Sequence, residues 1–312
     1  MKLALAGDTM LGRKVAKRLE SQPPESLVAP ELVVVAREAD LFLLNLECCI
    51  SERGEPFPDR PFHFRAPPLA VETLAHLGVD CVTLANNHAL DFGAQALLDT
   101  LHHLQAAGIA CVGAGPDRQA ARAPVVLAAK GFRLAVVAVT DHPREYAAGT
   151  DRPGVAFVDL RRGLPGSLAQ ALGGLEADAV LVTPHWGPNM TAQPVGHVRA
   201  AAGALLEAGA TLVAGHSAHV FHGVGPRVLY DLGDFLDDYQ VDWQLRNDLG
   251  LLFLVDLSGD RLEAIPLKLG FAHTQLASGE DAAWIERRFV AACAELGVAA
   301  AVEDDRLVTI WR

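Results

Sequence analysis

Hydrophobic and polar positions follow two different periods along this chain, and segments of the two kinds alternate. Short runs of consecutive apolar residues predict buried β-strands at 2–6, 41–44, 79–84, 109–112, 125–128, 134–139, 179–182 and 211–214. Between these runs, apolar residues recur every three or four positions and predict helices at 11–20, 26–39, 69–77, from Gly93 onward, at 166–175 and at 195–208. Strands that alternate with helices predict an α/β fold.

The pattern changes after residue 227. Short strands are predicted at 228–230, 251–256, 261–267 and 307–311, with one amphipathic helix at 282–296. We expect these strands to be antiparallel. We predict one domain over 1–312, in which residues 1–240 form a core that carries the motifs. In this prediction, the strands and helix of segment 250–312 complete a second sheet. The Pro-, Gly- and Arg-rich segment 51–68 predicts a long irregular loop, and such loops in compact domains are usually functional.

Composition excludes several classes of partner. The chain has 26 basic and 38 acidic residues, a net charge of −12, which argues against binding nucleic acid or an anionic membrane. Its five cysteines include no Cys-x-x-Cys pair, which predicts reduced thiols and a cytoplasmic location. No apolar run approaches the length of a membrane span, so no membrane anchor is expected.

The stretch 82–93, VTLANNHALDFG, runs from a predicted strand into a turn that carries side chains suited to chemistry. Asn86, Asn87 and His88 follow the strand, and Asp91 lies three residues further on. Turns of this kind are where open α/β sheets bind their ligands. In the alternative, structural interpretation, the asparagines shape the turn and Asp91 caps the next helix.

Other predicted strands also end in potential ligands. Asp8, Glu47 and His185 each follow a strand, and His216 and His219 follow another. Together with Asn87 they offer carboxylate, amide and imidazole groups, a mixture that suits Mn, Fe or Zn better than Ca or Mg. Each residue alone could be a cap or a turn former. Their repetition at successive strand ends favours a shared divalent metal site.

Seven blocks of this sequence resemble the signature blocks of the CapA-type capsule and poly-γ-glutamate synthesis proteins, in the same order. They are GDTMLGR (7–13), NLECCIS (45–51), FRAPP (64–68), TLANNHALDFG (83–93), HWG (185–187), GHSAHVFHGV (215–224) and YDLGDFLDD (230–238). That family is a branch of the calcineurin-like metallophosphatases. The resemblance implies a sandwich of two β-sheets flanked by helices, in α-β-β-α layers, with a two-metal site between the sheets.

The resemblance also implies a role for each candidate residue. Asp8 would bind the first metal, and Glu47 would bridge the two metals. Asn87 and His185 would bind the second metal. His216 and His219 would complete the ligand sets, one on each metal. His88 would be a general acid, held in position by Asp91.

Some positions depart from the family pattern. Met10 stands where the wider superfamily has a histidine ligand, and a thioether is a poor ligand for a hard ion, so a weak or empty first metal site is expected. Asp234 replaces the usual asparagine, and His222 replaces a common glutamine. The membrane anchor of the capsule proteins is also missing, which argues against a role in polymer export.

These observations predict a metal-dependent hydrolase that cleaves a phosphoester or a related ester or amide bond. His88 would protonate the leaving group. Arg13 and Arg65 are candidates for binding an anionic small-molecule or peptide substrate, with surface solvation as the alternative for both. One alternative function is processing of polyglutamate or a peptide by transpeptidation, amide hydrolysis or epimerisation. Another is a binding protein whose site no longer turns over.

Overall fold

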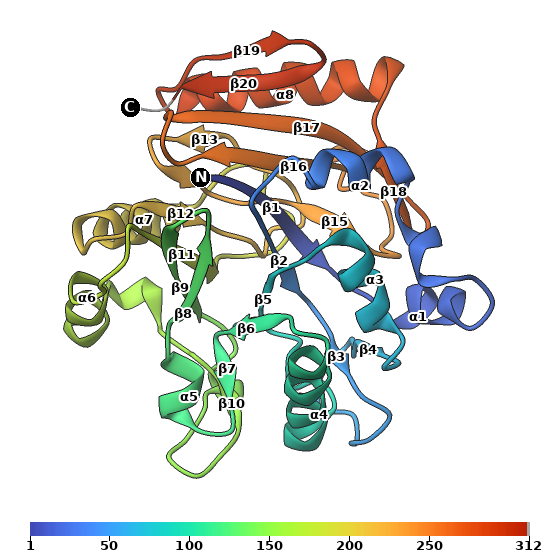
Figure 1. Cartoon of the computed structure of the whole chain (residues 1–312), viewed down its shortest axis with the longest axis vertical. Helices are drawn as coiled ribbons and strands as arrows, with labels where there is room; N and C mark the ends of the chain where they lie inside the picture. The colour runs from blue at the N-terminus through green and yellow to red at the C-terminus, as the bar shows by residue number, and fades with distance from the viewer. Residues whose placement is uncertain (311–312) are drawn as a thin grey trace.

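Two β-sheets packed face to face form the centre of the computed structural model, which describes residues 1–310 (Figure 1). The parallel part of the larger sheet consists of β1 (Lys2–Thr9), β2 (Leu41–Leu46), β5 (Cys81–Thr83) and β6 (Ala110–Val112). Its antiparallel part consists of β16 (Leu249–Asp256), β17 (Arg261–Gly270), β18 (His273–Leu276), β19 (Ala300–Glu303) and β20 (Arg306–Ile310). A short strand, β15 (Asp234–Leu236), pairs with the end of β1.

The smaller sheet is built around β9 (Phe132–Thr140), β11 (Ala179–His185) and β12 (Leu212–Ala214), which are parallel. It is extended by β8 (Val125–Ala129), β14 (Val228–Leu229) and β13 (Val224–Gly225). The β8–β9 pair is antiparallel. Separate two-stranded ladders join β3 (Cys49–Ile50) to β4 (Arg65–Ala66) and β7 (Ala114–Gly115) to β10 (Gly154–Val155).

Helices cover the outer face of each sheet. On the larger sheet they are α1 (Arg13–Leu19), α2 (Pro30–Ala36), α3 (Ala70–Leu77) and α4 (Gly93–Ala106). On the smaller sheet they are α6 (Gly166–Gly173) and α7 (Gly196–Glu207). The five-residue helix α5 (Arg118–Arg122) packs on β7, and α8 (Gly279–Glu295) lies across the β17–β19 region (Figure 1).

Successive side chains of β1 pack on opposite faces of the larger sheet. Ala4 and Ala6 pack into the core shared with α1 to α4, whereas Leu3 and Leu5 pack between the two sheets. Both faces of the strand are therefore buried, which explains its uninterrupted apolar sequence. The predicted fold class, two β-sheets between layers of helix, is confirmed.

The C-terminal strands belong to a different sheet from the one we predicted. They are antiparallel, but β16 pairs with β1, with Leu3 opposite Val255, so segment 250–312 extends the larger, N-terminal sheet. The prediction that this segment completes the second sheet is wrong. Periodicity shows that a strand has a buried face, but it carries no information about its neighbour. The predicted strand 307–311 corresponds to β20, and its last residue, Trp311, lies outside the described residues.

The single helix predicted at 26–39 is also wrong. The structure has a 3₁₀ turn at Pro24–Leu27 and then α2 from Pro30. Val28 is extended between them and forms a bridge to Thr274 of β18. Pro30 suits the first position of a helix, where its missing N–H leaves no hydrogen bond unmade, and it disfavours helical geometry in the residue before it.

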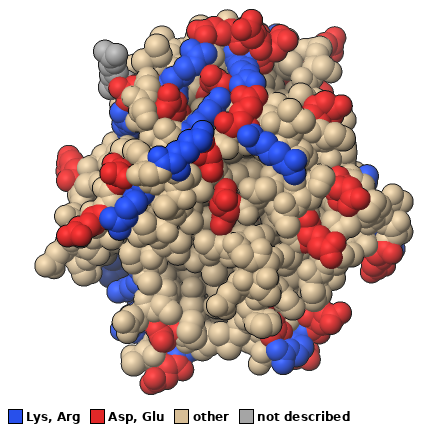
Figure 2. Space-filling model, in the orientation of Figure 1, with Lys and Arg blue, Asp and Glu red and all other residues tan. Residues whose placement is uncertain are grey.

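Charged side chains of both signs are intermixed over the antiparallel part of the larger sheet, at the top of the view in Figure 2. Ion pairs there connect Arg306 with Glu38 and Glu263, and Lys2 with the same two carboxylates. The exposed face of this part of the sheet is thus neutralised internally. Among residues 1–310, no helix is both long enough and apolar enough to cross a membrane.

Candidate metal centre

The candidate metal centre lies where strands of both sheets end. Asp8 is near the end of β1, and Glu47 directly follows β2. His185 is the last residue of β11 and forms a parallel bridge to His216, which follows β12, as does His219. The sheets meet here, with His216 Nδ1 3.9 Å from Asp8 Oδ1. The carboxyl ends of strands are the usual binding edge of an open α/β sheet.

One set of potential ligands, the first group, consists of Asp8, His219 and Asp234. Their ligand atoms all lie within 4.8 Å of one another. His219 Nδ1 is 3.2 Å from Asp8 Oδ2 and 2.8 Å from Asp234 Oδ1. The φ angle of His219 is 59°, a left-handed conformation that is uncommon outside glycine and concentrates at functional sites.

The second group consists of Asp8, His185 and His216, whose ligand atoms also lie within 4.8 Å of one another. His185 Nδ1 is 2.8 Å from His216 Nδ1, and His216 Nε2 is 3.3 Å from the hydroxyl of Thr83. The hydroxyl of Thr183 is closer to the same Nε2 atom, at 3.0 Å. Two hydroxyls therefore hold Nε2, and Nδ1 is the nitrogen of His216 that faces His185 and Asp8.

Glu47 faces both groups. Its Oε1 atom is 3.9 Å from His185 Nε2, and its Oε2 atom is 3.9 Å from His219 Nδ1. The Tyr239 hydroxyl donates a hydrogen bond of 3.1 Å to Oε2 and holds the carboxylate in place. One carboxylate thus presents an oxygen to each group, which is the arrangement that a bridging ligand requires.

Several buried atoms of this centre form no hydrogen bond within residues 1–310. They are Asp8 Oδ2, Glu47 Oε1, His185 Nε2 and Asp234 Oδ2, and Asn87 Oδ1, on the turn after β5, is unpaired in the same way. A buried polar atom left unpaired costs about 1–3 kcal/mol. Converging lone pairs of carboxylate and imidazole groups are what a Mn, Fe or Zn ion takes up. The residues present therefore fit a divalent metal.

Protonation favours the same interpretation. Burial, and then proximity to His216, lowers the pKa of His185 well below its usual value, and burial lowers the pKa of His216 to about 4. Both rings are therefore neutral at neutral pH, as metal ligands must be. Burial, together with the charge of Asp8, raises the pKa of Glu47 well above its usual value, because two buried carboxylates repel each other without a cation.

His88 lies on the turn after β5 and is held from several directions. Its Nδ1 atom is 2.6 Å from Asp91 Oδ2, and its ring stacks on Phe64 with the centroids 4.0 Å apart. The backbone N–H of Phe64 donates to the same Asp91 oxygen at 2.7 Å, and Tyr146 donates to the other at 3.0 Å. Asp91 is thus a buried anchor for the ring, and His88 Nε2 is the free ring nitrogen. Asp91 does not cap α4, whose N-terminal cap has no side-chain hydrogen bond.

A second histidine–aspartate pair, which the sequence analysis did not identify, flanks His185. Asp141 follows β9, and its N–H donates to the carbonyl of His185 at 3.1 Å. Its carboxylate lies 2.5 Å from His142 Nδ1 and 3.3 Å from His197 Nε2. The rings of His142 and His185 are 5.1 Å apart, and 30% of the His142 side chain is exposed. The same strand-end rule, applied to the strand at 134–139, could have found this pair.

The two arginine candidates have different surroundings. The guanidinium of Arg13 is 5.6 Å from the ring of Phe64 and 5.9 Å from that of Tyr239, and it pairs with Asp238 at 3.1 Å. Because these two rings touch His88 and Glu47, Arg13 lies beside the centre. Arg65 stacks on Phe92 at 4.1 Å and reaches the carbonyl of Gly54, and none of its described contacts is to a candidate ligand.

Residues that depart from the family pattern lie in different places. Met10 is fully buried in the outer core, and its Sδ atom accepts the N–H of Gly12, so it is not directed at the centre. His222 bonds to the carbonyl of Thr191, away from the ligand groups. Asp234 is the exception, because it belongs to the first group.

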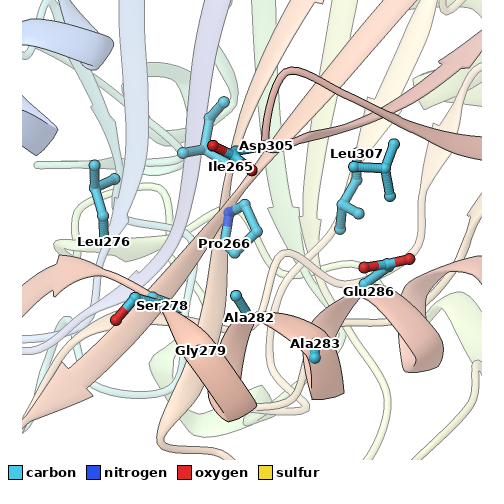
Figure 3. Close-up of a pocket in the computed structure, with 12 residues that line it drawn as sticks. Ile265, Pro266, Leu276, Ser278, Gly279, Ala282, Ala283, Glu286, Asp305 and Leu307 are labelled. Atoms are coloured by element: carbon cyan, nitrogen blue, oxygen red, sulfur yellow. The ribbon is translucent and has the colours of Figure 1, made fainter.

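A separate cavity of about 590 Å³ lies between β17, α8 and the β19–β20 hairpin (Figure 3). Its lining is mostly apolar, with Ile265, Pro266 and Leu307 on the sheet side. Glu286 and Asp305 are the ionisable side chains among the described residues that line it. It offers no cluster of ligands comparable with the candidate metal centre.

The fold and the site together define an α/β protein with a candidate two-metal centre between facing sheets. The chain belongs to the bacterial capsule synthesis protein family PGA_cap, whose family model matches residues 2–239. The resemblance to CapA-type proteins is thereby confirmed.

Relatives of known name support this assignment. The chain is 32% identical over 292 residues to a probable polyglutamine synthesis accessory protein of Mycobacterium tuberculosis (strain H37Rv), covering 87% of this chain and 77% of the relative. It is 29% identical over 259 residues to the PGA biosynthesis protein CapA of Bacillus subtilis (strain 168), covering 80% and 66%. A solved 5′-nucleotidase precursor from Thermus thermophilus is similar with a TM-score of 0.42 and 16% identity, covering 95% of this chain and 59% of that one.

Proposed function

We propose that this chain is a metal-dependent hydrolase that cleaves a phosphoester or a related ester or amide bond. The observation that carries the proposal is the convergence of buried, unpartnered lone pairs on Asp8, Glu47 and His185. A protein gains nothing in stability from such atoms unless they bind something. Their position at the meeting edge of two sheets supports a site for chemistry.

In this proposal, Asp8 and His219 would hold the first metal, and Asn87, His185 and His216 would hold the second. Glu47 would contribute to both. A bound divalent metal lowers the pKa of water from about 15.7 towards 7 and so supplies hydroxide at neutral pH.

His88 supplies the proton. Asp91 holds Nδ1 of the ring, and the stacked ring of Phe64 fixes its plane, so the proton that is transferred resides on Nε2. From there it passes to the leaving oxygen or nitrogen of the substrate. A positioned general acid of this kind contributes about 10²–10⁴ in rate.

Groups beside the centre bind the anionic part of the substrate. Arg13 offers a guanidinium next to Phe64 and Tyr239, and His142 offers a partly exposed ring next to His185. Asp141 holds Nδ1 of His142, which leaves its Nε2 atom for the substrate. Arg65 stays a candidate from sequence alone, since its described contacts are to Phe92 and Gly54.

The family supports a second candidate function, processing of polyglutamate or of a peptide at the same centre. The names of the mycobacterial and Bacillus relatives refer to polyglutamine and PGA synthesis. In this case, His88 would move a proton to or from an amide nitrogen rather than a phosphate oxygen.

The test is to purify the protein without chelator, measure bound metal by elemental analysis, and assay an aryl phosphate, an aryl phosphodiester and a γ-glutamyl anilide. We expect bound metal, hydrolysis of a phosphate ester that chelation abolishes, and recovery on adding Mn²⁺. His216→Ala should lose metal and activity together. Metal-free protein, or activity that is indifferent to chelation, would contradict the proposal. Cleavage of the γ-glutamyl anilide alone would favour the second candidate.

A further inference from the structure

Two aspartates that are far apart in the sequence are direct neighbours on paired strands. Asp8 of β1 and Asp234 of β15 are opposite each other in a parallel ladder. The backbone fixes this pairing, because the N–H of Asp8 donates to the carbonyl of Gly233 at 2.9 Å. Both residues are 1% exposed. The strand pairing therefore brings two carboxylates together in a buried place.

One imidazole lies between the two carboxylates and cannot satisfy both. His219 Nδ1 is 2.8 Å from Asp234 Oδ1 and 3.2 Å from Asp8 Oδ2. A single N–H donates well to one acceptor, here Asp234 Oδ1, so Asp8 Oδ2 is left without a hydrogen bond. Asp234 Oδ2, the second oxygen of that carboxylate, is also buried and without a hydrogen bond among residues 1–310.

The charges in this place do not balance. Glu47 is also nearby, with Oε2 3.9 Å from the same nitrogen of His219. Three buried acidic groups thus surround an imidazole that carries at most one positive charge. None of them forms an ion pair with a lysine or arginine in the described part of the chain. Buried carboxylates without compensation are strongly unfavourable, and a divalent cation would compensate them.

We propose that Asp234 is a metal ligand through Oδ2, in the first group with Asp8 and His219, and that it replaces the ligand lost at Met10. The inference rests on the proposed metal centre, to which it adds a residue and a reason for Met10. The thioether of Met10 is engaged in the outer core, where it accepts the N–H of Gly12. Asp234 reaches the same first group from β15, with a harder donor than a thioether.

The identity of the ligands indicates the ion. The first group offers two carboxylates and one imidazole, whereas the second group offers one carboxylate and two imidazoles. A site richer in oxygen favours a harder ion, so the first group should take Mn²⁺ or Fe²⁺. We therefore expect the first site to bind a metal with normal affinity, contrary to the weak or empty site that Met10 alone predicts.

The test is the substitution Asp234→Asn, compared with Asp80→Asn as a matched control. Asparagine keeps the size of the side chain and an oxygen that can accept from His219, but it removes the charge. Asp80 is an aspartate of the same sheet, in the segment before β5, and its carboxylate accepts the N–H of Phe42. Metal-stripped protein is titrated with Mn²⁺ by calorimetry, and bound metal is counted by elemental analysis.

We expect the wild type and Asp80→Asn to bind two Mn²⁺ ions. Asp234→Asn should bind one of them more than about 100-fold more weakly, beyond the 10- to 100-fold loss seen when an outer partner of a metal ligand is removed. An Asp234 that only pairs with His219 would give a loss within or below that range, and that result would overturn the proposal.

A second measurement needs no variant. Crystals of the wild-type protein soaked in Mn²⁺ should show an anomalous peak at bonding distance from Asp234 Oδ2, and a peak bonded to Asp8 but remote from Asp234 would overturn the proposal. Neither readout uses turnover. If Mn²⁺ binds through Asp234 but no substrate is hydrolysed, the proposed function alone is contradicted. If Asp234→Asn hydrolyses the substrate normally and its metal affinity is unchanged, this inference alone is contradicted.

Discussion

At the scale of single residues, His88 shows how a side chain is prepared for proton transfer. Asp91 holds its Nδ1 atom, while the ring of Phe64 covers one face. Asp91 itself is 1% exposed and is fixed by hydrogen bonds from Phe64 and Tyr146. An imidazole anchored this firmly loses little further freedom when it meets a substrate, which is how positioning contributes to rate.

The first prediction concerns His88→Asn. Metal content should stay nearly unchanged, because His88 belongs to neither ligand group. Turnover on the substrate found by the assays above should fall by about 10²–10⁴, the range for a lost general acid. Elemental analysis and steady-state kinetics measure the two quantities.

His102→Asn is the matched control, because His102 is an exposed histidine on α4. It should change neither metal content nor turnover. Loss of metal from the His88 variant, or full activity in it, would show that the turn after β5 has a purely structural role.

At the scale of elements, the centre depends on how closely β1 and β15 approach. Gly7 precedes Asp8, and a Cβ atom added to it would lie 1.8 Å from the carbonyl oxygen of Gly233. Gly233, with a φ of 74°, makes the turn that leads into Asp234. Two glycines therefore allow the backbones to touch where both aspartates of the first group begin.

The second prediction is that Gly7→Ala destabilises the protein and weakens the first metal site together. The methyl group has to push β15 away, and inserting one into a packed region costs about 1–3 kcal/mol. Displacement of β15 also separates Asp8 from Asp234. Urea unfolding measures the stability, and Mn²⁺ calorimetry measures the site.

Gly203→Ala is the control substitution. Gly203 is exposed within α7, and an added Cβ atom meets nothing within 4 Å. Alanine there should raise the free energy of unfolding by about 0.5–1 kcal/mol, since glycine is a poor helix former. An equal effect of the two substitutions would contradict the close approach of β1 and β15.

At the scale of the whole molecule, ion pairs connect the two ends of the described chain. Arg306 of β20 pairs with Glu38, which follows α2, and with Glu263 of β17, while Lys2 of β1 pairs with both acids. These side chains are partly exposed, so each pair is screened by solvent and contributes little alone. As a network, they hold the antiparallel extension against the parallel part of the sheet.

The third prediction is that Arg306→Gln lowers the free energy of unfolding by about 1 kcal/mol at low ionic strength and by less at high ionic strength. The hydrogen bond and charge of Arg306 lower the pKa of Glu38. A lowered carboxyl pKa means that this contribution is present above the unfolded pKa and is lost as the pH falls through the folded value. The difference between wild type and variant should therefore shrink in acid.

Arg162→Gln serves as the control for this prediction. Arg162 is 81% exposed and forms an ion pair of 3.3 Å with Asp159. Its loss should leave stability nearly unchanged at any ionic strength. Urea unfolding at two salt concentrations and two pH values compares the variants. An effect of Arg306→Gln that is independent of salt would rule out the electrostatic explanation.

Much of the fold was predictable because it depends on local patterns. The strands β1, β2 and β11 are buried on both faces, so nearly every position in them has to be apolar. The sequence shows this directly as runs of consecutive apolar residues. The same holds for Asp8, Glu47 and His185, which stand where such runs end. Sheet geometry brings strand ends together, so these candidates could be predicted as neighbours before any coordinates were known.

Other features depend on contacts between distant segments. The pairing of β16 with β1 and of β15 with Asp8 is a choice among strands of similar pattern, and no local period distinguishes the partners. From the sequence, Asp234 is only a departure from the family pattern. Its burial beside Asp8 could not be predicted. The approach of His197 to Asp141 was hidden for the same reason, because α7 brings His197 from a distant part of the sequence.

The sequence by itself determined which residues could serve as ligands and acids, because chemistry and periodicity are properties of each residue and its neighbours along the chain. Only the tertiary structure decided which of these residues share a buried place, and how many lone pairs remain unpaired there. The physical reason is that burial and electrostatics depend on distance in space, and strand pairing set those distances for Asp8, His219 and Asp234.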